Sequence, residues 1–152
     1  MKKVEVTVYT FGELGESAQN KTIESSLLIN VGEGSDWCQS IRESAKSIGL
    51  NITQFIDGTQ WTIAGEFCES AKDTAKLIMD TADKKSGIYK IFHSWSVSKF
   101  DSAPANNEFK KLLLREYLHM FKDRHEFLTG ESAVRKTLMA KDQYYTSDGE
   151  LF

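Results

Sequence analysis

The sequence contains very little proline or cysteine, and it has no long hydrophobic run. One proline, two cysteines and ten glycines among 152 residues make a disordered proline-rich tract or a disulfide framework unexpected. The longest apolar runs, such as Leu27-Leu28-Ile29, are far shorter than the roughly 20 residues that cross a membrane. Residues 1–10 lack the apolar core of a secretory signal. We therefore expect a cytoplasmic protein without a membrane segment.

The sequence also lacks an excess of one charge sign. Its net charge is −3, with ten acidic and five basic residues in positions 1–70, and twelve and fourteen in positions 71–152. A protein that neutralises nucleic-acid phosphates normally has a clear basic excess, and a DNA mimic needs a dense acidic surface. This weak gradient favours neither function.

Motifs for catalysis and for metal binding are missing as well. The chain has no G-x-S-x-G nucleophile motif and no GxxxxGK[ST] phosphate loop, and Cys38 and Cys68 lack a CxxC context, so we expect two buried thiols. Glu116, His119 and Asp123 share a helix face, but no further ligand can be named beyond His125. A metalloenzyme is thus the least favoured hypothesis, and we expect no catalytic residue, cofactor or metal.

The composition does support a packed core, since 40% of the residues are hydrophobic. Four segments have strand patterns. Val4, Val6 and Val8 alternate with polar residues, and a second alternating segment, residues 88–98, would place His93 on its inward face. Between them, residues 50–56 and 59–68 flank Asp57-Gly58, which is typical of a tight hairpin turn.

Helical spacing predicts five helices: residues 16–29, 35–48, 70–82, 107–128, and a short one after Ser132. The predicted order is β-α-α-β-β-α-β-α-α, an α+β fold with a four-stranded, largely antiparallel sheet and helices on one face. The whole chain, 1–152, fits a single domain. Residues 101–107, which include Pro104, are a candidate internal linker.

Aromatic residues point to binding. If the N-terminal valines face the helices, Tyr9 points away from them, and we predict that Phe55 and Phe92 share this outer sheet face. Such a face can anchor a protein partner or stack nucleic-acid bases, or it can be covered by the C-terminal segment. That segment contains four large apolar side chains, which we expect to fold back and become buried: Tyr144, Tyr145, Leu151 and Phe152.

Both ends of the chain resemble small proteins encoded by phages and prophages. Tyr9-Thr10-Phe11-Gly12-Glu13-Leu14 is similar to their Y-x-F-x-E-L opening, although Gly15 replaces the usual capping serine. Asp148-Gly149-Glu150-Leu151 is similar to their D-G-E-L close, although Lys141-Asp142 replaces the familiar alanine-asparagine. The middle, from Gly49 through Gly65-Glu66-Phe67, fits the same proteins, whereas most of residues 69–130 is not diagnostic.

The resemblance implies a function without supplying catalytic residues. Some members of this family carry antitoxin-type labels, and small phage proteins without active sites often occupy a host protein. We therefore expect a non-enzymatic accessory protein that binds and inhibits a host protein, such as a CRISPR effector or another bacterial defence component. The alternatives are an antitoxin-like protein and a nucleic-acid or nucleotide-binding module.

Overall fold

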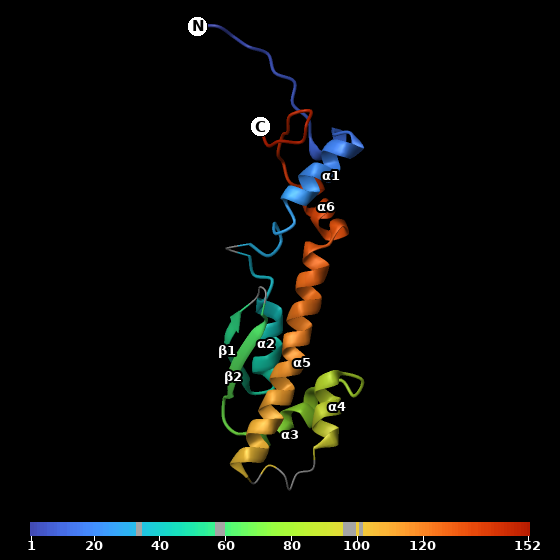
Figure 1. The fold of residues 1–152 in the computed structure, drawn as a ribbon. Coiled ribbons are helices and arrows are strands. Elements are labelled where there is room, and N and C mark those ends of the chain that lie inside the picture. Colours follow the sequence, from blue (N-terminus) through green and yellow to red (C-terminus); the bar gives the residue numbers. More distant parts are fainter. Residues whose placement is uncertain (33–34, 57–59, 96–99, 101) are drawn as a thin grey trace. The chain divides into compact units, whose positions relative to one another are not determined.

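The computed structural model describes residues 1–32, 35–56, 60–95, 100 and 102–152. Over these residues the fold is α+β, as predicted from the sequence. It has six α-helices, one 3-10 helix and one two-stranded antiparallel sheet in the part of the chain that is described (Figure 1). The chain divides into two compact units. Unit 1 consists of residues 1–37 and 124–152, and unit 2 consists of residues 38–123.

Unit 2 contains the predicted hairpin. Strand β1 (Leu50–Ile56) pairs antiparallel with β2 (Thr62–Phe67), and the register runs from Leu50 opposite Phe67 to Ile56 opposite Thr62. The two strands and their pairing confirm the sequence prediction. The Asp57-Gly58 turn itself lies outside the described residues.

A β-bulge decides which hairpin side chains face the core of unit 2. The register shifts between Ile52 and Gln54, so one extra residue is inserted into β1. As a result Phe55 lies on the same face as Leu50 and Ile52, although strict alternation would put it on the other face. Its ring stacks on Phe121 with 4.2 Å between the ring centroids.

Unit 2 has four helices besides the hairpin. Helix α2 (Gln39–Ser47) precedes the hairpin in the sequence, and three follow it: α3 (Ala71–Thr81), α4 (Gly87–Ser94), and α5 (Ala103–Thr129) up to Asp123. Local residues mark the ends of two of these helices. Gly49 follows α2 with φ of +80°, a conformation that glycine adopts without steric cost, and the Ser70 side chain accepts a hydrogen bond from the Asp73 N–H at the start of α3.

Residues 88–94 form α4, so the predicted fourth strand is wrong there, and residues 96–98 lie outside the described part. The segment has apolar residues at the spacing of one helix face: Ile88, Ile91, Phe92 and Trp95. A short apolar segment can fit this helical spacing and the alternation of a strand at the same time. The deciding local signal is Ser86, whose hydroxyl accepts a hydrogen bond from the Tyr89 N–H and caps the helix.

The candidate linker is largely helical. Residues 103–107 form the beginning of α5, with Pro104 in the first turn. Proline fits there because the N–H groups of the first turn make no hydrogen bond within the helix. Asp101 lies outside the described residues. The helix contributes four large side chains to the core, since Phe109, Leu113, Tyr117 and Phe121 are buried.

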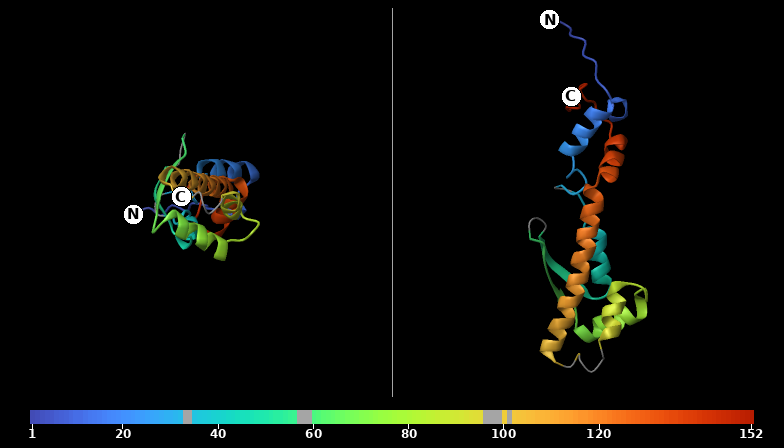
Figure 2. Two further views of the ribbon diagram at one scale, coloured as in Figure 1. Left: turned by 90° about the horizontal axis from the view of Figure 1, so that it is seen from below. Right: turned by 45° about the vertical axis from the view of Figure 1, so that its right-hand side comes forward.

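Unit 1 is built on helices from both ends of the chain. The 3-10 helix η1 (Phe11–Glu13) and α1 (Glu16–Ser25) pack against α6 (Glu131–Ala140), and α1 lies beside α6 in both side views (Figures 1 and 2). Six buried residues form the core of this unit: Phe11, Leu14, Ile23, Val134, Leu138 and Tyr145.

The predicted N-terminal strand does not join a four-stranded sheet. Among the described residues, the N-terminal segment makes one isolated antiparallel bridge, between Tyr9 and Tyr145, and residues 1–7 are exposed. Its alternating pattern is that of a strand, but α1, α6 and the C-terminal segment supply no further strand beside it. The observed sheet is therefore the β1–β2 hairpin alone within the described residues.

The turn at Gly149 yields the first prediction. Gly149 has φ of +84°, and a Cβ added there would lie 2.6 Å from the Ala18 carbonyl oxygen and 2.5 Å from the Thr22 hydroxyl. The left-handed conformation alone costs a non-glycine residue about 1–2 kcal/mol. Gly149→Ala should therefore lower the free energy of unfolding by about 2 kcal/mol or more in a denaturant titration.

Gly12→Ala is the matched control, since its added Cβ would meet only Met139 at an ordinary 3.4 Å. Its unfolding midpoint should stay close to that of the wild type. Equal stability of the Gly149→Ala and Gly12→Ala proteins would contradict the prediction.

Candidate protein-binding surface

Three short extended segments meet at Tyr145 in unit 1. The Tyr9 N–H donates to the Tyr145 carbonyl at 2.9 Å, and the Tyr145 N–H donates back to the Tyr9 carbonyl at 2.8 Å. On its other side Tyr145 pairs with Leu151, flanked by hydrogen bonds from Thr146 N–H to Glu150 O and from Phe152 N–H to Tyr144 O. Tyr145 is therefore the middle of three paired segments.

The C-terminal segment folds back as predicted, but it does not bury all four of its large apolar side chains. Tyr145 is 3% exposed, whereas Tyr144, Leu151 and Phe152 are 49%, 64% and 69% exposed. Tyr144 and Phe152 stand directly opposite each other beside the Tyr145–Leu151 bridge, so their side chains share one face. We call these two residues the terminal aromatic pair.

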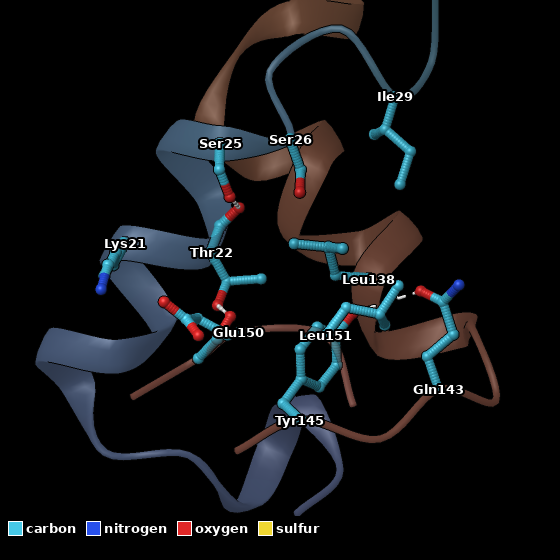
Figure 3. Close-up of a pocket in the computed structure, with 11 residues that line it drawn as sticks. Lys21, Thr22, Ser25, Ser26, Ile29, Leu138, Gln143, Tyr145, Glu150 and Leu151 are labelled. Atoms are coloured by element: carbon cyan, nitrogen blue, oxygen red, sulfur yellow. Dashed lines mark hydrogen bonds between the residues drawn. The ribbon is translucent and has the colours of Figure 1, made fainter. Parts of the chain in front are cut away.

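A hollow of about 380 Å³ lies next to these segments in unit 1 (Figure 3). Its lining mixes apolar side chains with hydroxyls and two opposite charges: Lys21, Thr22, Ser25, Ser26, Ile29, Leu138, Gln143, Tyr145, Gly149, Glu150 and Leu151. The Thr22 hydroxyl donates to the Ala18 and Gly149 carbonyls, and the Ser25 hydroxyl donates to the Thr22 carbonyl. Both hydroxyls serve local structure, and neither has the arrangement of a nucleophile beside a general base.

The structure separates the three residues that were predicted to share an outer sheet face. Tyr9 packs against the core of unit 1, Phe55 faces α5 because of the bulge in β1, and Phe92 lies on α4, where its ring contacts Tyr89 with a centroid distance of 5.6 Å. A common face needed the four-stranded sheet, which the described residues do not form. Sequence reasoning also missed the exposed terminal aromatic pair.

The histidines do not assemble a metal site in the described part of the chain, where no group of three or more His, Cys, Asp or Glu side chains could hold an ion. His93 is exposed near the end of α4, so its predicted inward orientation is wrong. His119 is exposed on α5, and the His125 ring contacts the Trp37 ring with 5.5 Å between the ring centroids. Cys68 is exposed as well, in contrast to the expected buried thiol.

Comparisons with known proteins give no direct assignment. Neither a scan against protein-family models nor searches of curated proteins and of solved structures found a match. None of the helices in the described residues has the length and apolar character needed to cross a bilayer. The function must be inferred from the surface itself.

Unit 2 has its own hollow, of about 350 Å³, where Tyr117 meets Ser44, Asp83 and Met120. Tyr117 is almost fully buried, and this desolvation raises the pKa of its phenol from 10.0 to about 12, although a hydrogen bond with Ser44 acts in the opposite direction. The hollow therefore holds a phenol that stays neutral at physiological pH and does not act as a base.

The pKa of Tyr117 gives a prediction about stability at high pH. The folded state holds this proton more tightly than the unfolded state, so the stabilisation is complete below about pH 10 and is lost as the pH rises towards 12. The loss from this group should be on the order of 2–3 kcal/mol. Tyr117→Phe should show a shallower decline of unfolding free energy between these pH values, measured by urea titration at each pH, and Tyr89→Phe is the control. Parallel curves for wild type and Tyr117→Phe would contradict the prediction.

Proposed function

We propose that this chain is a non-enzymatic phage or prophage accessory protein that binds a host protein and inhibits it, with a bacterial defence system as the target. The observation that carries the proposal is the terminal aromatic pair. Tyr144 and Phe152 are held side by side on a hydrogen-bonded backbone while both remain exposed.

An exposed aromatic pair on an ordered backbone suits protein recognition. Tyrosine and phenylalanine provide a large contact area with few rotatable bonds, so little conformational entropy is lost when a partner covers them. Leu151 is exposed as well, but it shares the face of its bridge partner Tyr145 rather than that of the terminal aromatic pair. Exposed apolar residues that lie together on a folded protein are typical of sites that another macromolecule covers.

The polar surroundings fit a binding role better than a catalytic one. The Thr22 and Ser25 hydroxyls of the adjacent hollow donate to backbone carbonyls, and Lys21 and Glu150 place both charge signs around it. A partner surface with an apolar centre and a mixed-charge rim would complement this arrangement. The choice of a host protein as the partner rests on the resemblance of both chain ends to phage and prophage proteins.

The terminal aromatic pair supplies the test. Truncating a central aromatic contact typically costs at least about 2 kcal/mol, a loss of affinity of roughly thirtyfold. The Tyr144→Ser, Phe152→Ser double variant should therefore lose the host protein that tagged wild-type protein retains, as judged by co-purification and mass spectrometry. It should also lose the ability to suppress a resident defence system in a phage plaque assay.

Phe127→Ser is the control, since Phe127 is equally exposed in unit 1 but lies on α5. All three proteins should unfold at similar temperatures, because substitutions of exposed residues usually change stability by less than about 0.5 kcal/mol. Wild-type protein that retains no specific host protein and leaves each defence system intact would rule out the proposed function. Retention by the double variant would instead rule out the surface.

A further inference from the structure

The N-terminal segment, residues 3–8, has the alternating pattern of a strand and no adjacent strand in the described residues. It leaves unit 1 as an extended trace (Figure 1), with Val4 80% and Val6 56% exposed. The valines alternate with Lys3, Glu5 and Thr7, so they lie on one face of the strand. Unpaired backbone groups beside such an apolar row are a template for pairing with another strand.

The turn at Gly149 explains why the segment has no neighbour within unit 1. Tyr9 and Tyr145 are antiparallel partners, so a longer pairing would bring Thr7 opposite Ser147. The chain instead turns there, and the Gly149 N–H donates to the Thr146 carbonyl at 3.0 Å. The following residues return along the far side of Tyr145, where Leu151 pairs with it.

The Tyr9 bridge also fixes which backbone groups face outward. Both backbone groups of Tyr9 are hydrogen-bonded to Tyr145. Because successive residues of a strand direct their N–H and C=O groups to opposite edges, those of Val4, Val6 and Val8 point to the edge away from Tyr145. This edge, which we call the valine edge, is open along its whole length in the described residues.

We propose that the valine edge pairs antiparallel with the same edge of a second copy of this chain, centred on Val6. In this register Val6 lies opposite Val6 of the second copy, and Val4 lies opposite Val8 on both sides. All the apolar side chains are then on one face, and the even-numbered residues exchange the backbone hydrogen bonds.

Charge and valine pairing favour this register over those centred on Glu5 and on Val4. Centring on Glu5 would place two glutamates directly opposite each other, which is destabilising. Centring on Val4 would place Lys2 opposite Val6 and leave Val8 without a partner. Centring on Val6 places Glu5 opposite Thr7 and Lys3 opposite Tyr9, so no like charges meet, and three valine pairs form.

The pairing is continuous with an existing set of bridges, which distinguishes it from an isolated ribbon. At each end, Lys3 of the second copy would lie beside Tyr9. Tyr9 already pairs with Tyr145, and Tyr145 pairs on its other side with Leu151. Each end of the ribbon is therefore four segments wide, whereas two strands alone are only marginally stable in water. The inference does not depend on the proposed function, because it concerns the opposite end of the chain and a different partner.

The test measures mass and amide exchange on the full chain. Light scattering after gel filtration, across a dilution series, should show a species of twice 17.2 kDa that dissociates on dilution. In the dimer, amide exchange followed by NMR should be slowed at Val4, Val6 and Val8 but not at Glu5 and Thr7. A monomer at every concentration, or equal exchange at odd and even positions, overturns the proposal.

Two proline variants test the edge itself. Val6→Pro removes a donor at the centre of the valine edge and should abolish the dimer, whereas Thr7→Pro removes an N–H that points to the other edge and should retain it. Both positions are exposed and outside the core, so the folded state should persist, which circular dichroism checks. A dimer that survives Val6→Pro, or one that is lost in both variants, overturns the assignment of this edge.

Discussion

The turn from Thr146 to Gly149 determines the arrangement of unit 1. Its backbone needs a positive φ at Gly149, and its position is fixed by the Thr22 hydroxyl, which donates to the Gly149 carbonyl at 2.9 Å. Because the chain reverses there, the residues after it pair with one edge of Tyr145 and leave Tyr9 on the other edge. One glycine conformation thus accounts for the pairing of Leu151 with Tyr145 and for the end of pairing along the N-terminal segment.

Local signals in the sequence predicted the parts of the fold that local chemistry decides. The hairpin of residues 50–67, the serine cap at Ser70 and the glycine after α2 all depend on residues within a few positions of one another. Residues 88–94 show the limit of such signals, because their apolar spacing fits both a strand face and a helix face. The Ser86 hydroxyl, which caps the segment at its N-terminus, favours the helix.

The candidate site was harder to predict, because it depends on contacts between distant residues. Grouping Tyr9, Phe55 and Phe92 required a sheet order that no local pattern contains, and the single inserted residue in β1 reverses the face on which Phe55 lies. The terminal aromatic pair has the same origin. Tyr144 and Phe152 are both exposed because the backbone between them turns, which places one opposite the other, while Tyr145 takes the buried position.

The same turn affects both ends of the chain. If residues 146–149 continued as a straight strand, they would pair with residues 5–8 and cover the inner edge of the N-terminal segment, and Phe152 would no longer lie opposite Tyr144. The reversal instead uses the far edge of Tyr145 for the last residues. It thereby places Tyr144 opposite Phe152, with both side chains exposed, and limits the pairing of the N-terminal segment within unit 1 to Tyr9. The geometry at Gly149 thus determines the inner edge of the N-terminal segment and the position of Phe152, whereas the outer valine edge is open in either arrangement.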